Sequence, residues 1–281
     1  MKVCLVLEGG AMRGLYTAGI LDALVDTDIK IDCIIGVSAG ALFGVNYKSK
    51  QKGRVLRYNT KYANDKRYMG LHSLITTGNL VNTEFAYHEL PTKLDIFDEE
   101  EYSKSKTDFY AVITNINTGK AEYKKIINAT IQVDELRASG SMPFVSQPVK
   151  IDDNYYLDGA LADSIPVLKA KEMGYDKVIV VLTRPKEYRK KKHSPLMAKL
   201  FYKKYPNLVE AINTRYKQYN DTLDIIEELE DKKDIYVFRP STDLKIKRVE
   251  KNKSKLEAMY NLGLKDFKDN LKSLKKYLKK K

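Results

Sequence analysis

The chain has 281 residues, of which 43% are hydrophobic, so it can bury an adequate core and is expected to be globular, with one large or two smaller domains. Its first apolar run, Val3–Leu7, is far too short for the core of a secretory signal or for a membrane span, which leaves a cytoplasmic protein as the expectation. The formal net charge is +13, and the whole excess lies in the last third: residues 1–184 hold 23 basic and 23 acidic side chains, whereas residues 185–281 hold 27 and 14.

The N-terminal segment alternates apolar runs with helical patterns. Val3–Leu7 is continuous and rich in branched residues, as in a parallel strand covered on both faces. A Gly-rich turn and a helical pattern follow, and Ile31–Ile35 then predicts a second buried strand before a helix at Ala41–Tyr47. Cys4 and Cys33 fall in the two strand-like runs, which favours buried free thiols over a disulfide or a metal site.

The middle of the chain continues this alternation. Residues 48–107 are polar, aromatic and charged, with helical stretches such as Thr83–Leu90. The runs Phe109–Ile116 and Ala121–Ile127 flank a turn that contains glycine, as in a β-hairpin. The next expected elements are a strand at Tyr155–Leu157, a helix that ends near Gly174 and a strand at Lys177–Thr183. Strands that alternate with helices predict an α/β fold with a mainly parallel sheet flanked by helices.

The last third has a different character and is expected to complete or cap the core. It contains a basic loop at residues 186–193, a helical region at 195–233 and a strand at Ile235–Phe238. An amphipathic terminal helix follows, with one apolar face and one lysine-rich face. We therefore divide the chain at residue 184. The basic region is suited to an anionic membrane surface or, less readily, to nucleic acid, unless it is only a solvated exterior.

The pentapeptide Gly36–Gly40, with Ser38 at its centre, fits the nucleophile elbow G-x-S-x-G. A buried strand precedes it and a helix follows, as the elbow requires. Small residues are needed two positions from the serine because the turn is sharp, and the helix N-terminus can stabilise a developing oxyanion. The alternative is a strand-to-helix turn that happens to contain serine.

The Gly-rich loop Glu8–Gly14 can present backbone amides to an anion. This anion is either the oxyanion of an acyl-transfer intermediate or the phosphate of a nucleotide. The dinucleotide fingerprint asks for an acidic residue at the end of the next strand, where this chain has Ser38, while Asp32 stands at that strand's beginning. The loop therefore favours acyl transfer.

The base for Ser38 is not obvious from the residues alone. His193 lies within a run of cations that disfavour an imidazolium, and His72 and His88 lie in helical stretches. A carboxylate is then the remaining candidate for the base. Asp158 ends a strand-like run before Gly159-Ala160. Sequence alone does not choose it over the other aspartates at positions 152, 153 and 163.

Three motifs in the same order resemble those of patatin-like phospholipases: the Gly-rich loop, the serine elbow and Asp158-Gly159-Ala160. The similarity spans residues 1 to about 184 and includes Thr114-Asn115 and Met142-Pro143-Phe144. Residues 182–190, with Tyr260 and Gly263, are similar to a bacterial branch that carries an extra C-terminal segment.

The resemblance implies a Ser-Asp dyad without metal or organic cofactor, acting on lipid esters such as phospholipids or lysophospholipids. Ser38 is the implied nucleophile and Asp158 the implied proton acceptor, with Gly36 and Gly40 shaping the elbow and Gly159 and Ala160 completing the acidic motif. The implied oxyanion loop comprises Gly9, Gly10, Ala11, Met12, Arg13 and Gly14. Ala11 departs from the family's third glycine, which matters if this position needs positive φ. The alternative is a non-catalytic lipid- or nucleic-acid-binding protein on the same fold.

Overall fold

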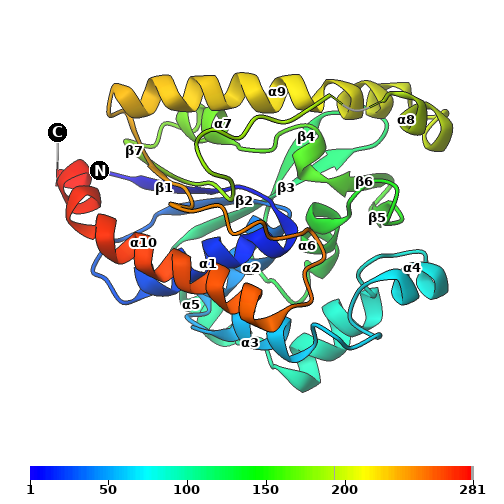
Figure 1. The fold of residues 1–281 in the computed structure, drawn as a ribbon, viewed down its shortest axis with the longest axis horizontal. Coiled ribbons are helices and arrows are strands. Elements are labelled where there is room, and N and C mark those ends of the chain that lie inside the picture. The colour runs from blue at the N-terminus through cyan, green and yellow to red at the C-terminus, as the bar shows by residue number, and fades with distance from the viewer. Residues whose placement is uncertain (193, 280–281) are drawn as a thin grey trace.

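The computed structural model describes residues 1–192 and 194–279, and its centre is an eight-stranded sheet in the order β5-β6-β3-β2-β1-β7-β8, with β4 paired to β3 (Figure 1). The strands are β1 (Val3–Leu7), β2 (Cys33–Val37), β3 (Asp108–Asn115), β4 (Ala121–Lys125), β5 (Val149–Ile151), β6 (Asn154–Asp158), β7 (Lys177–Val181) and β8 (Ile235–Phe238). The pairs β3·β2, β2·β1, β1·β7 and β7·β8 are parallel, and β4, β5 and β6 run antiparallel to their neighbours. The predicted α/β fold with a mainly parallel sheet is confirmed.

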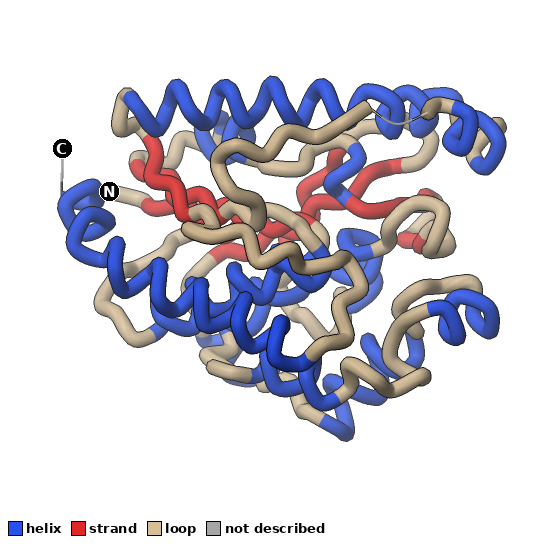
Figure 2. Tube along the Cα trace, in the orientation of Figure 1, coloured by secondary structure: helices blue, strands red, loops and turns tan. Residues whose placement is uncertain are grey.

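Helices cover both faces of this sheet (Figure 2). They are α1 (Leu15–Val25), α2 (Ala39–Lys48), α3 (Arg54–Lys61), α4 (Leu71–Thr77), α5 (Glu99–Lys104), α6 (Val133–Gly140), α7 (Val167–Glu172), α8 (Leu196–Phe201), α9 (Pro206–Asp231) and α10 (Lys253–Lys279), with the 3₁₀-helices η1 (Ala11–Gly14) and η3 (Gly159–Leu161) and the π-helix η2 (Glu84–Leu94). None of the helices in the described residues combines the length and the apolar composition that a membrane crossing requires.

Alternate residues of β1 point into two separate apolar cores, because successive side chains of a strand face opposite sides. Leu5 and Leu7 pack with α1, α2 and α10, whereas Cys4 and Val6 pack with α7 and α9. Both cysteines are buried free thiols on adjacent strands, as the sequence predicts.

The second strand differs from the prediction, which placed it at residues 31–35. It begins two residues later, at Cys33, although the backbone of Asp32 already bonds to Val3 and Asp108, and its carboxylate accepts the amide of Val3 at 2.7 Å. It then continues through Gly36 and Val37, which pair with Ala111 and Val112 of β3. The short strand β5 was not predicted either, since three residues give too little alternation to detect.

The C-terminal residues are packed into the same structure as the rest of the chain. β8 extends the sheet beside β7, and α10 lies against α1. A Cβ atom at Gly19 or Gly263 would overlap backbone of the facing helix, so these glycines set how closely the two helices approach. The division at residue 184 stays a prediction about the organisation of the chain.

Candidate active site

Ser38 occupies a sharp turn between β2 and α2. Its backbone has φ 54° and ψ −124°, a strained conformation for a side chain other than glycine, and the residue is only 8% exposed. A Cβ at Gly40 would overlap the carbonyl oxygen of Leu7, so β1 and α2 approach closely only because position 40 is glycine. The turn has the geometry of a nucleophile elbow.

The hydroxyl of Ser38 donates a hydrogen bond of 2.7 Å to Oδ2 of Asp158. Sheet register brings the two together: Val37 pairs with Val112 in β3, and the next residue of β3, Ile113, pairs with Asp158. The other carboxylate oxygen, Oδ1, accepts the amide of Ala160 at 2.9 Å, which fixes the orientation of the carboxylate.

Asp158 is 4% exposed, and burial raises the pKa of its carboxyl above the ordinary value. The positive charge of Arg215, the hydrogen bond from Ser38 and the amide of Ala160 act in the opposite direction on this pKa. A carboxylate with a raised pKa is a better proton acceptor than one in water.

No histidine side chain in the described residues bonds to Ser38 or Asp158. His72 lies exposed on α4, and His88 lies exposed on η2, where it borders the cavity described below. His193 falls outside the described residues. Among residues 1–192 and 194–279, the hydrogen-bond acceptor of the Ser38 hydroxyl is a carboxylate oxygen.

The Gly-rich loop runs directly past Ser38. A Cβ at Gly9 would come within 2.8 Å of the Ser38 Cβ, so the loop backbone reaches the elbow only with glycine there. Gly10 is extended at φ 175°, and Ala11 has φ 50°. Ala11 therefore does hold the positive φ that makes its departure from glycine significant.

Three of the loop amides are engaged within the protein. The amide of Glu8 donates to the carbonyl of Val181 at 3.0 Å, that of Met12 to the carbonyl of Arg248 at 3.4 Å, and that of Arg13 to the carbonyl of Gly10 at 3.2 Å. Within the described part of the chain, the amides of Gly9, Gly10 and Ala11 have no such acceptor. Gly10 and Ala11, which turn past Ser38, are the candidates for binding an anion there.

Glu8 anchors the loop to neighbouring elements. Its carboxylate accepts the amide and hydroxyl of Thr183 at 2.6 and 3.0 Å and the hydroxyl of Tyr219 at 2.7 Å. Arg13 makes a long contact of 3.5 Å to the carbonyl of Ile246. A Cβ at Gly14 would meet the side chain of Ala39, so glycine at this position lets the loop and α2 pack closely.

An apolar cavity of about 210 Å³ opens beside Ser38. Ala11, Met12 and Ser38 form one end of its lining, and the walls are largely aliphatic and aromatic, among them Leu42, Phe43, Tyr58, Tyr68, Leu80, Val81, Leu90, Leu136 and Met142. Such a space is suited to an acyl chain.

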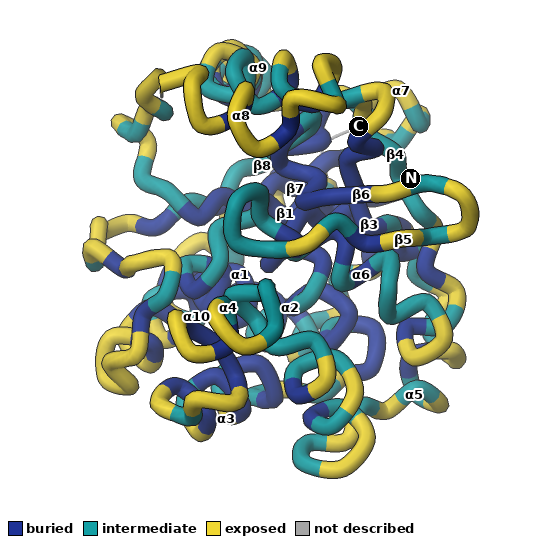
Figure 3. The backbone as a smooth tube through the Cα atoms, turned by 90° about the vertical axis from the view of Figure 1, so that its right-hand side faces the viewer, coloured by how far each residue is buried: buried dark blue, intermediate teal, exposed yellow. Residues whose placement is uncertain are grey.

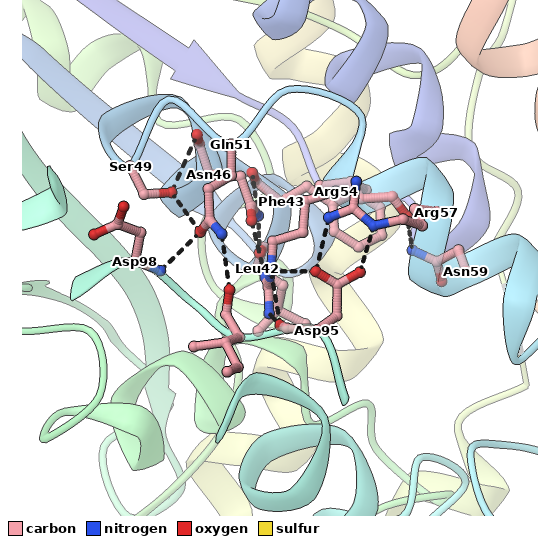
Figure 4. Close-up of polar contacts among 12 residues, drawn as sticks. Leu42, Phe43, Asn46, Ser49, Gln51, Arg54, Arg57, Asn59, Asp95 and Asp98 are labelled. Carbon is pink, nitrogen blue, oxygen red and sulfur yellow. Dashed lines mark hydrogen bonds and ion pairs between the residues drawn. The ribbon is translucent and has the colours of Figure 1, made fainter. Parts of the chain in front are cut away.

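Arg54 also lines this cavity, but its charge is fully partnered (Figure 4). Its guanidinium donates to Asn46 Oδ1 at 2.9 Å and to the carbonyl of Asp95 at 2.6 and 3.1 Å, and its Nε lies 3.3 Å from the Asp95 carboxylate. Arg57 adds a bidentate pair with the same carboxylate at 2.7 and 2.8 Å. This network holds α2, α3 and the segment before α5 together.

Two residues of the site were not among the predicted site residues, although the resemblance to the family includes Ala138-Ser139. The hydroxyl of Ser139, on α6, accepts the amide of Ser38 at 2.9 Å and so supports the elbow from behind. Arg215 is the charge that most strongly opposes the raised pKa of Asp158. The sequence held a signal for Arg215, because it stands between Ala211 and Tyr219 on the core-facing stripe of α9, where a charge is unusual.

A family model described as patatin-like phospholipase matches residues 5–171. The chain belongs to this family. Within the patatin-like phospholipase region lie the loop, the elbow and Asp158, and a second model, described as a domain of unknown function (DUF6363), matches residues 205–279.

Several curated proteins are similar to this patatin-like chain. The uncharacterized protein YjjU of Escherichia coli K12 is 26% identical over 66% of this chain and 53% of its own length. The probable lipid hydrolase 463L of invertebrate iridescent virus 6 is 27% identical over 58% of this chain and 61% of its own. The lysophospholipase nte1 of Aspergillus oryzae is 27% identical over 64% of this chain, which spans only 12% of that protein.

Proposed function

We propose that this protein is a lipid acyl hydrolase that uses Ser38 as nucleophile and Asp158 as base. The observation that carries the proposal is the buried 2.7 Å hydrogen bond between the two side chains, with Ser38 in the lining of an apolar cavity. Membership of the patatin-like phospholipase family and the names of the relatives support hydrolysis of lipid esters.

The chemistry follows from the positions of the groups. Ser38 Oγ attacks the ester carbonyl carbon while its proton passes to Asp158 Oδ2. The carbonyl oxygen becomes an oxyanion in front of the Gly10 and Ala11 amides, with the N-terminus of α2 nearby. Asp158 returns the proton to the leaving alcohol, and a water activated by Asp158 then cleaves the acyl-enzyme and regenerates Ser38.

The cavity supports an acyl ester as substrate rather than a polar one. Its lining is largely apolar, so a hydrocarbon chain placed there loses contact with water. A phospholipid or lysophospholipid ester, with the chain in the cavity and the carbonyl at Ser38, fits this arrangement.

We further propose that the basic C-terminal third holds the enzyme peripherally on an anionic membrane from the cytoplasm. On α8, Leu196 and Leu200 are 72% and 75% exposed, next to the exposed Lys199. On α4, Leu71 and Ile75 are 70% and 74% exposed. Both helices lie at the same end of the molecule (Figures 1 and 3). Exposed leucines beside lysines suit the interface of an anionic bilayer.

The decisive experiment compares Ser38→Ala and Asp158→Asn with a matched control, Ser141→Ala, which removes a buried hydroxyl that donates to the carbonyl of Arg137 at 2.8 Å. We expect the first two to lower kcat for a lysophospholipid by at least about a thousandfold. Replacing His72, His88 and His193 together should leave most of the activity. Turnover retained in Ser38→Ala would contradict the proposal.

Labelling by a fluorophosphonate probe separates an enzyme from a non-catalytic binding protein, because only an activated serine reacts. Wild type and Ser141→Ala should be labelled, and Ser38→Ala should not. An unlabelled wild type that still binds lipid would favour the binding protein.

A further inference from the structure

Three basic residues from the last third of the chain converge on the region behind the Ser38–Asp158 pair. Lys190 lies in the loop after β7, Arg215 on α9 and Arg248 on the connection from β8 to α10, which crosses the centre of the molecule (Figure 1). The carbonyl of Arg248 accepts the amide of Met12, which places this residue at the Gly-rich loop, and Arg248 borders the same cavity as Ser38. Arg13 follows Met12 directly.

Within the described residues, none of these four cations forms an ion pair with an acidic side chain, in contrast to the partnered Arg54. The Nε atoms of Arg13 and Arg215 are shielded from solvent and have no hydrogen-bond partner in the same residues. Shielding a charged group whose donors lack partners is costly, and an anion bound beside Arg13 and Arg215 would offset this cost.

The nearby carboxylates are already engaged. Glu8 binds Thr183 and Tyr219, and Asp158 binds Ser38 and the Ala160 amide. Four cations therefore face two occupied carboxylates, which leaves an excess of positive charge beside the nucleophile. A singly or doubly charged anion would balance it.

The same concentration of positive charge acts on the ammonium group of Lys190. Its Nζ lies 4.3 Å from the centre of the Tyr219 ring, and its backbone is tied to Asn220 at 2.8 and 3.0 Å. Burial, together with the charges of Arg215, Arg248 and Arg13, lowers the pKa of Lys190 to about 7, although Glu8 opposes the shift. A bound anion would raise this pKa again.

We propose that Lys190, Arg215 and Arg248, together with Arg13, bind the phosphate group of a substrate whose ester lies at Ser38. Guanidinium groups bind phosphate oxygens in bidentate fashion, and the cavity that Ser38 and Arg248 both border takes the acyl chain. The substrate class is then a glycerophospholipid or lysophospholipid rather than a neutral glyceride. This assignment rests on the proposed hydrolase function.

The first test measures discrimination between a lysophospholipid and a monoacylglycerol with the same acyl chain, both below their critical micelle concentrations. Arg248→Gln and Lys190→Gln should each lower the ratio of the two kcat/KM values by about tenfold, since each removes a charge-assisted contact. Lys247→Gln is the matched control, because it removes the same charge from an exposed side chain one residue away. If the ratio of the two kcat/KM values is unchanged in both variants, these residues do not bind the phosphate of the headgroup.

The second test uses Ser38→Ala protein and so does not depend on hydrolysis. Inorganic phosphate and glycerol 3-phosphate are titrated by calorimetry near pH 7.5 in buffers of different ionisation enthalpy. We expect binding with proton uptake, as the pKa of Lys190 rises, and at least about tenfold weaker binding when Arg248→Gln is added. Phosphate binding together with an unchanged substrate ratio would assign the site to free phosphate. If neither ligand binds and the ratio does not change, the cluster is not a phosphate site, even where ester cleavage is normal.

Discussion

The hydroxyl of Tyr260, on α10, donates a hydrogen bond of 2.6 Å to the carboxylate of Asp22, on α1. The same carboxylate oxygen accepts the amide of Gly53 at 2.7 Å, so one aspartate joins the first helix, the last helix and the start of α3. Burial raises the pKa of Asp22, and the two hydrogen bonds oppose this rise. The C-terminal helix is thus tied to the helical layer that supports the elbow.

Gly263 should be intolerant of a side chain, since a Cβ there would overlap the carbonyl of Tyr16. We expect Gly263→Ala to lower the free energy of unfolding by about 2 kcal/mol, measured by urea denaturation. Asn261→Ala, on the exposed face of the same helix, should change it by less than about 0.5 kcal/mol. Equal effects would show that α10 is not held by this close contact.

Asp158→Asn should stabilise the protein at pH 7 while it removes activity. Because burial raises the pKa of Asp158, the ionised carboxylate costs stability above the pKa of the unfolded state, and this cost disappears as pH falls below that value. We expect a Tm a few degrees above wild type at pH 7 and no difference near pH 3. If the difference in Tm between Asp158→Asn and wild type increased toward low pH, the raised pKa of Asp158 would be contradicted.

Arg215→Gln should shift the pH profile of the reaction. The charge of Arg215 lowers the pKa of Asp158, so its removal raises that pKa further, and the base is ionised only at higher pH. The acid limb of kcat/KM for a neutral ester should move to higher pH, and Arg215→Lys should largely restore it. Lys217→Gln, on the exposed side of α9, should leave the profile in place.

Ala11→Gly should make the chain more stable, because alanine at φ 50° pays a conformational penalty that glycine avoids. We expect a gain of about 0.5 kcal/mol in urea denaturation, with activity retained. The same substitution at Ala18, inside α1, should instead cost about 1 kcal/mol. A loss at both positions would contradict the strained conformation of Ala11.

Replacing both Leu196 and Leu200 by serine should weaken binding to anionic vesicles by at least about tenfold, since each exposed leucine would lose its burial in the interface. Hydrolysis of a soluble short-chain ester should not change. Leu168→Ser, at an exposed position on α7, serves as the control in the same sedimentation assay. Unchanged vesicle binding would exclude α8 as the docking element.

Much of the fold was predictable because its signals are local. The apolar runs that became β1, β7 and β8 and the hairpin of β3 and β4 needed only short-range patterns. The start of β2 was placed two residues too early because the apolar run begins at Ile31, whereas strand pairing begins at Cys33. The strand β5 has too few residues for its period to be recognised, whereas the helical stretch predicted at Thr83–Leu90 corresponds to the π-helix η2.

The sequence by itself determined the elbow around Ser38 and the Gly-rich loop, since both depend on residues adjacent in the chain, whereas resemblance to a family was needed to choose Asp158. Only the tertiary structure brought the two side chains to 2.7 Å, because that distance depends on the register of three strands. It alone gathered Lys190, Arg215 and Arg248 behind the loop. Those residues are far apart in sequence, and no local periodicity links a loop, a helix and a connection that meet only when the sheet is formed.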